Sequence, residues 1–112
     1  METTRQQKVA RQVQKDLSEI LQYAGKDVTP GKMVTITRVR MSPDLALAKI
    51  YFSVFPSENA DKSLTQLQKH VKRIRLELGR KVRHQLRIVP ELAFFIDDSM
   101  DYAQHIDELL NK

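Results

Sequence analysis

Two β-rich runs lie close together in residues 33–55, and they leave this chain few ways to fold. Residues 33–41 are rich in Val, Ile and Thr with nearly alternating polarity, which is typical of a strand. Residues 45–55 resume a mostly apolar, β-rich pattern that ends at Pro56. The connection between the runs is the tight-turn sequence Ser42, Pro43 and Asp44. We therefore expect the two strands to pair as a hairpin.

The segments on either side of this hairpin have helical periodicity. In residues 5–24, apolar side chains recur every three or four positions, and Gly25 follows as a natural C-cap. The same spacing continues through residues 60–86. That run is long for one helix of a globular protein, so we expect it to bend.

The C-terminal part of the chain predicts one more strand and one more helix. Residues 88–96 contain Pro90 near their start and a dense apolar end, as expected of a third strand. Residues 100–110 have one apolar face, and Asp98 or Ser99 can cap the helix that they predict. The expected order is helix, strand, strand, bent helix, strand, helix.

The composition suits one compact domain. The chain has 112 residues, of which 41% are hydrophobic, which leaves little room for a second domain. We expect residues 1–112 to form a single domain, with residues 99–112 as a helical extension. The absence of cysteine excludes disulfides and thiolate metal sites, and residues 1–15 contain no apolar run that could act as a secretion signal or membrane span. These features predict a cytoplasmic protein without a membrane partner.

Basic residues outnumber acidic ones and concentrate on two helical stripes. Lys and Arg number 19 against 14 Asp and Glu, a net charge of +5 that favours anionic partners. The first helix carries one stripe opposite its apolar face: Arg5, Lys8, Arg11 and Lys15. A second stripe shares one side of the long helical run: Lys69, Lys72, Arg73, Arg80, Arg83 and Arg87, flanked by Arg75 and Lys81. Only Glu77 opposes these charges, so partners within the segment cannot neutralise them, and they can engage phosphates.

A solvated basic face that binds nothing in particular is the plainer alternative, and the clustering of the charges argues against it. Residues 91–112 are acidic, with only Lys112 in opposition, so this end could contact a different partner. The strand aromatics are expected to be buried and not to form a stacking platform: Tyr51, Phe52, Phe55, Phe94 and Phe95. Recognition of phosphate and shape is therefore favoured over base stacking.

No constellation of residues supports catalysis or a cofactor. Asp97, Asp98 and Asp101 invite a metal hypothesis, but their spacing matches no calcium loop, and helix capping explains them as well. The histidines have no metal-ligand spacing, the serines stand in no nucleophile motif, and no glycine-rich loop could cradle a phosphate. We expect a protein that is not an enzyme and uses no cofactor or small-molecule substrate.

These motifs together resemble the ribosome-binding factor A family of bacterial assembly factors of the small ribosomal subunit. The matching segments span nearly the whole chain: RQQKVARQVQKDLSEIL, VTITRVRMSPDLALAKIYFSVF, LELGRKVRHQLR and VPELAFFIDDS. The first specific signature is Ser42, Pro43 and Asp44 before a lysine-containing strand. The second is Pro90, Glu91 and Leu92 before aromatics and an Asp-Asp-Ser run. Either signature alone is weak, whereas both in this order are strong.

The resemblance implies an α+β, type II KH-like fold of order α-β-β-α-α-β, here with a short C-terminal helix, and RNA binding without the GxxG loop of ordinary KH domains. The family bends its second and third helices at Ala-x-Gly, and the corresponding place here is His70, Val71 and Lys72. The resemblance also implies binding to immature small subunits near the 5′-terminal helix of their RNA, promotion of late rRNA processing, importance in the cold and release before translation. We expect the free protein to be a monomer.

Carried over by position, the resemblance marks candidate rRNA contacts: Arg5, Lys8, Arg11, Lys15, Arg80, Arg83 and Arg87. Charge alone adds Lys69, Lys72, Arg73 and Lys81. The signature at residues 42–44 is better explained as hairpin structure. Two other functions stay open, namely a general nucleic-acid-binding or nucleoid-associated module and a small hydrolase or metal protein.

Overall fold

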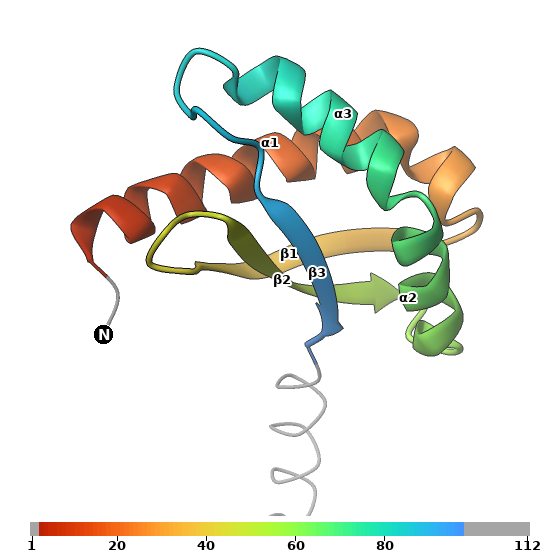
Figure 1. Cartoon of the computed structure of the whole chain (residues 1–112). Helices are drawn as coiled ribbons and strands as arrows, with labels where there is room; N and C mark the ends of the chain where they lie inside the picture. The colour runs from red at the N-terminus through yellow and green to blue at the C-terminus, as the bar shows by residue number, and fades with distance from the viewer. Residues whose placement is uncertain (1–2, 98–112) are drawn as a thin grey trace, which may run out of the picture.

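The elements follow one another in the expected order (Figure 1). The computed structural model describes residues 3–97, which form α1 (Thr4–Val28), β1 (Met33–Met41), β2 (Leu47–Phe55), α2 (Ala60–Lys69), α3 (Val71–Val82) and β3 (Glu91–Ile96). This succession, α-β-β-α-α-β, agrees with the predicted α+β class. The expected extension at residues 99–112, with its helix at residues 100–110, lies outside the described residues.

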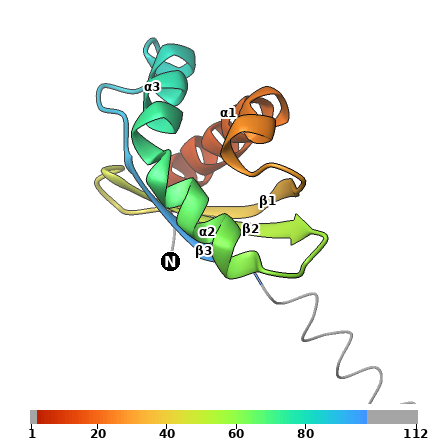
Figure 2. The ribbon, with the colours of Figure 1, turned by 90° about the vertical axis from the view of Figure 1, so that its right-hand side faces the viewer.

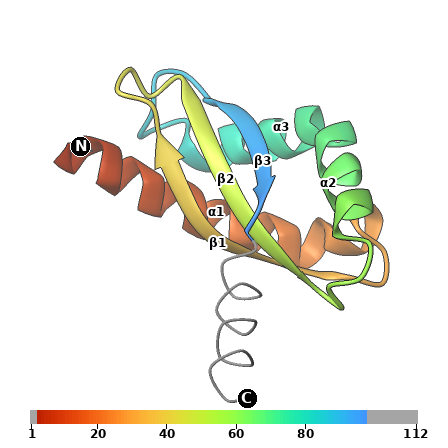
Figure 3. The same ribbon diagram turned by 90° about the horizontal axis from the view of Figure 1, so that it is seen from below.

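Two layers make up the fold. In the sheet, which has the order β1-β2-β3, β1 and β2 pair antiparallel, whereas β2 and β3 pair parallel. The three helices cover one face of this sheet, as Figures 1 and 2 show, and Figure 3 looks onto the opposite face, where no described helix lies. The core fills the space between the layers, and the rings of Phe52 and Phe94 meet edge to face there with centroids 6.3 Å apart.

Helix α1 begins at a capping box and runs farther than expected. Thr3 Oγ1 accepts a hydrogen bond from the Gln6 backbone N–H, and Gln6 Oε1 accepts one from the Thr3 backbone N–H. The prediction that Gly25 ends this helix is wrong, because the helix continues to Val28, which is fully buried. Burying a valine side chain is worth about 1.5–3 kcal/mol, more than the roughly 1 kcal/mol that an interior glycine costs a helix.

Side chains of α1 also hold β1 in place. Gln6 Nε2 donates to the carbonyl oxygen of Met41 at 3.0 Å, and Gln14 Nε2 donates to that of Ile36 at 3.1 Å. The second bond lies at an irregularity of the ladder, since the β1–β2 register shifts between Ile36 and Arg38. These bonds set the position of α1 relative to the sheet, and with it the position of the basic stripe on its outer side.

The long helical run breaks at His70, as expected. Helix α2 ends at Lys69 and α3 starts at Val71, while His70 between them has φ −100° and ψ 12°. The predicted end of the run at residue 86 is wrong, because α3 stops at Val82. The backbone N–H groups of Gln85 and Leu86 still donate to the Val82 carbonyl oxygen, at 2.8 and 2.9 Å, and these bonds close the helix with a turn.

Strands β2 and β3 both start later in the chain than predicted. Strand β3 starts at Glu91 and not at residue 88, and Ile88 is 69% exposed in the loop of residues 83–90. This loop passes so close to α3 that a Cβ atom on Gly79 would lie 3.0 Å from Val89 Cγ2. Strand β2 starts at Leu47 and not at residue 45, because Leu45 has a positive φ of 62° and belongs to the turn.

Candidate nucleic-acid interface

The basic stripe of α1 lies on the surface, away from the sheet. Its four cations are exposed, whereas Val13 and Leu17 on the opposite side of the helix are fully buried. None of the four makes a hydrogen bond or an ion pair within residues 3–97: Arg5, Lys8, Arg11 and Lys15. Lys15 contributes to lowering the pKa of the Glu19 carboxyl, after the larger effects of Lys81. The stripe therefore presents four cations whose N–H donors are available to a partner.

Two ion pairs tie α3 to α1 and neutralise part of the second stripe. Lys81 Nζ lies 2.9 Å from Glu19 Oε2, and Arg73 Nη2 lies 3.5 Å from Asp27 Oδ2. The hydrogen bond between Lys81 and Glu19 lowers the pKa of the Glu19 carboxyl and raises the pKa of the Lys81 ammonium group. The sequence predicted that acids within residues 69–87 could not neutralise this stripe. Acids of α1, outside that segment, neutralise two of its cations.

The second stripe is not one continuous surface. The break at His70 separates Lys69 on α2 from Lys72 on α3, and Figure 3 shows the two helices running in different directions. Arg87 lies in the loop beyond the end of α3. The prediction that these cations share one side of a single helical run is therefore wrong, since the helical periodicity on which it relied is interrupted twice.

The structure divides the eleven candidate residues by how available their charges are. Arg80 Nη1 lies 3.6 Å from Glu77 Oε1 on its own helix, and Arg83 Nε donates to Nε2 of His84 at 3.2 Å. Four candidates have such partners: Arg73, Arg80, Lys81 and Arg83. Seven have no hydrogen bond or ion pair within the described part of the chain: Arg5, Lys8, Arg11, Lys15, Lys69, Lys72 and Arg87.

Helices α1 and α3 run antiparallel, which brings distant cations toward one end of the molecule. The ion pairs show this direction, because their partners advance along α3 as they go back along α1. In Figure 1, the loop that follows α3 lies over the N-terminal half of α1, the half that carries the basic stripe. Arg87 in this loop therefore lies toward the same end as the α1 stripe.

Arg75 has a structural role that the sequence did not reveal. Its Nη2 donates to the Val89 carbonyl oxygen at 2.8 Å, its Nε donates to that of Pro90 at 3.0 Å, and its Nη1 lies 3.6 Å from Glu91 Oε1. These contacts anchor the entry to β3, where the Pro-Glu-Leu signature lies. The partners are in a loop 14 and 15 residues away, so no local pattern could have identified them.

The Ser-Pro-Asp signature forms the hairpin turn, as predicted. Ser42 Oγ donates to Asp44 Oδ1 at 2.6 Å and accepts from the Leu47 N–H at 3.0 Å, and the Ala46 N–H donates to the same Asp44 oxygen. The hydrogen bond from Ser42, followed by that from Ala46, lowers the pKa of the Asp44 carboxyl. The polar side chains of this signature are thus occupied in holding the turn.

The prediction that the strand aromatics are all buried is wrong. Phe52 and Phe94 lie in the core, but Tyr51 is only half-buried, Phe95 is 41% exposed and Phe55 is 71% exposed. Successive side chains of a strand point to opposite faces, and the helices cover only one face of this sheet. The alternation around Phe52 and Phe94 was the signal that could have placed the other rings on the uncovered face.

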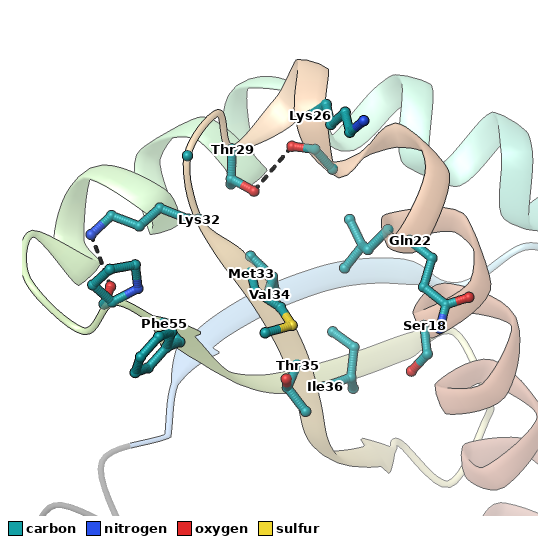
Figure 4. Close-up of a pocket in the computed structure, with 14 residues that line it drawn as sticks. Ser18, Gln22, Lys26, Thr29, Lys32, Met33, Val34, Thr35, Ile36 and Phe55 are labelled. Atoms are coloured by element: carbon teal, nitrogen blue, oxygen red, sulfur yellow. Dashed lines mark hydrogen bonds between the residues drawn. The ribbon is translucent and has the colours of Figure 1, made fainter.

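A groove of about 720 Å³ opens between the C-terminal half of α1 and β1 (Figure 4). Lys32 lies at one end and donates from Nζ to the carbonyl oxygens of Pro56 and Glu58, at 2.8 and 2.5 Å. Met33 and Phe55 contribute exposed apolar side chains. None of the described residues that line the groove is His, Cys, Asp or Glu, so they form no acid–base pair.

Residues 3–97 contain no group of three or more His, Cys, Asp and Glu side chains that could hold a metal ion. They also contain no helix long and apolar enough to cross a membrane. Asp97 accepts a hydrogen bond from the Thr37 hydroxyl, whereas Asp98 and Asp101, the other residues of the metal hypothesis, lie outside the described residues.

Comparison with known sequences agrees with the motifs. The model of the ribosome-binding factor A family matches residues 5–110. The curated protein of that name from Cytophaga hutchinsonii is 42% identical over 112 residues, which cover 100% of this chain and 84% of the relative. The one from Brevibacillus brevis is 40% identical over 113 residues, which cover 100% of this chain and 91% of the relative.

Comparison with solved structures confirms the predicted KH-like fold. The crystal structure of ribosome-binding factor A from Thermus thermophilus matches with a TM-score of 0.69 at 24% identity, covering 81% of this chain and 94% of that chain. A homology model of the T. thermophilus factor, fitted into the cryo-EM map of its 30S complex, matches with a TM-score of 0.64 at 26% identity. That match covers 80% of this chain and 91% of the T. thermophilus chain.

Proposed function

The chain belongs to the ribosome-binding factor A family, and on this premise we propose that it is an RNA-binding assembly factor of the small ribosomal subunit. It binds immature small subunits and promotes late maturation and processing of their RNA. The 42% identity to the C. hutchinsonii protein over the whole chain supports a shared role. The 30S complex of the T. thermophilus relative supports the small subunit as the partner. The region of the 5′-terminal rRNA helix is the contact site that the family resemblance implies.

One observation carries the RNA-binding part of this proposal, namely the four exposed cations of the α1 stripe that have no partner within residues 3–97. Such a cation displaces condensed counterions when it binds a phosphate, and this release favours binding. A cation already bonded to another side chain must share or lose that bond first. The primary rRNA contacts are therefore the cations without partners: Arg5, Lys8, Arg11, Lys15, Lys69, Lys72 and Arg87. The paired cations are secondary contacts: Arg73, Arg80, Lys81 and Arg83.

The proposed role is binding without catalysis. It needs no cofactor, metal or small-molecule substrate. We extend the proposal to a monomeric, cytoplasmic factor that matters most in the cold and leaves the subunit before translation. Importance in the cold and release before translation are what the resemblance to the family implies.

Sucrose-gradient sedimentation of a cell lysate tests this function. The protein should accumulate with free and precursor small subunits and be absent from polysomes, because an assembly factor leaves before translation starts. Equal occupancy of small subunits and polysomes would contradict an assembly role. Equal affinity for unrelated RNA and DNA would instead favour a general nucleic-acid-binding or nucleoid-associated module, which would use the same cations without preferring the ribosome.

A further inference from the structure

The helices leave one face of the sheet uncovered (Figure 3). This face carries a row of stacked planar groups. Tyr51 and Phe95 are cross-strand neighbours whose rings stack, with centroids 5.4 Å apart and planes inclined by 26°. The Arg38 guanidinium lies over the Tyr51 ring, 4.5 Å from its centroid, and Arg38 and Tyr51 are partners in the β1–β2 register. One side chain from each strand thus forms a stack across the sheet, which we call the open-face row.

The open-face row ends in an accessible ring. Tyr51 has the Arg38 guanidinium as its neighbour toward β1 and the Phe95 ring as its neighbour toward β3, so it is enclosed within the row. Phe95 stands on β3, an edge strand, and stays 41% exposed although one side of its ring is stacked. An exposed aromatic ring at the end of a stack can accept one more planar group. Every nucleobase has such a planar face.

Positive charge lies beside this ring. In the next row of the same face, Arg40 on β1 and Lys49 on β2 are register partners, and both side chains are exposed. Lys49 is also the register partner of Ala93, which lies two residues before Phe95 on β3 and therefore on the same face. A nucleotide whose base stacks on Phe95 thus has a cation nearby for its phosphate.

The acidic side chains at the two ends of β3 have other contacts. Glu91, at the start of β3, lies 3.6 Å from an Arg75 guanidinium nitrogen. Asp97, just beyond the end of β3, accepts a hydrogen bond from the Thr37 hydroxyl. Arg38 and Lys49 therefore add positive charge to this face, which favours an anionic strand.

We propose that the open-face row binds an unpaired base of single-stranded RNA, with Phe95 as the stacking platform and the neighbouring Lys49 as the phosphate contact. This inference rests on the proposed function in one respect, that the partner is RNA. It adds a second surface, on the opposite side of the sheet from α1. The α1 stripe binds phosphates whatever the base, whereas the open-face row binds a nucleotide that is not base-paired. A row that served only to stabilise the sheet would not distinguish RNA with bases from RNA without them.

Two labelled strands of equal length and charge separate stacking from electrostatic attraction: an oligouridylate and its abasic counterpart. The full-length protein should bind the oligouridylate about 5- to 150-fold more tightly in fluorescence anisotropy, the range that corresponds to one aromatic–base stack. Phe95→Leu should remove this preference and leave the affinity for the abasic strand unchanged. Phe55→Leu is the matched control, because Phe55 is also an exposed ring on this sheet but has no ring partner within residues 3–97, and it should keep the preference.

Each outcome of this experiment supports or overturns the inference. Equal affinity of the wild-type protein for the two strands overturns it, and if that protein still sediments with small subunits, the proposed function stands. If Phe95→Leu weakens subunit binding although the strands are not distinguished, the row contacts a protein, and the RNA inference is again overturned. Phe95→Tyr retains the ring and should retain the preference, which keeps the test decisive even if the leucine variant melts at a lower temperature.

Discussion

Neutralising the α1 stripe should flatten the salt dependence of RNA binding. The variant replaces four cations with glutamine, which lowers the net charge from +5 to +1: Arg5, Lys8, Arg11 and Lys15. Glutamine has nearly the same helix propensity as arginine and lysine, and all four side chains are exposed. Each substitution should therefore change the free energy of unfolding by less than about 0.5 kcal/mol.

The magnitude follows from the number of cations without partners. Seven phosphate contacts predict a slope of about −5 to −6 in a log–log plot of the binding constant against salt concentration, and three remaining contacts predict about −2 to −3. A fourfold rise in salt should thus weaken binding by about 10³ to 10⁴ in the wild-type protein and by only about 20- to 40-fold in the variant. Fluorescence anisotropy with a fragment of small-subunit rRNA at several salt concentrations measures both slopes.

A matched control neutralises the four cations that have partners, and it also gives a net charge of +1: Arg73, Arg80, Lys81 and Arg83. Its slope should stay close to that of the wild-type protein, and circular dichroism melts of both variants should show that they are folded. Equal flattening in the two variants would mean that net charge, and not the α1 stripe, governs binding. An unchanged slope in the α1 variant would place the interface elsewhere.

Two further predictions concern contacts within the fold. Arg75→Leu should lower the free energy of unfolding in urea by about 1–3 kcal/mol, because the carbonyl oxygens of Val89 and Pro90 lose a charged donor; unchanged stability would show that Arg75 does not anchor β3. A carboxyl whose pKa is lowered by folding, as in Asp44 and Glu19, stabilises the protein above its unfolded pKa, and this stabilisation is lost as the pH falls through the folded pKa. Between about pH 6 and about pH 3, which spans the ordinary range of Asp titration, the melting temperature should therefore fall less in Asp44→Asn than in the wild-type protein, and an equal fall would contradict the role of the Ser42–Asp44 bond.

Features that depend on residues close in the chain could be predicted from the sequence. The hairpin turn follows from Ser42, Pro43 and Asp44, whose bonds are made within a few residues. The bend of the second helical run was expected from its length, and its place at His70 from the resemblance to the family. The α1 stripe was visible because helical periodicity alone places its four cations opposite the apolar face.

Contacts between distant segments decided what the sequence could not. Helix α1 passes Gly25 because the core buries Val28, and that burial outweighs the local preference of glycine for a helix end. Lys72 and Lys81 look alike in the sequence, yet the packing of α3 against α1 gives only Lys81 a carboxylate partner. The rings of Tyr51 and Phe95 meet because β3 pairs in parallel with β2, and they face water because all the described helices lie on the other side of the sheet. Which surfaces are buried depends on the whole fold, so a local pattern can supply the charges and rings but not their partners.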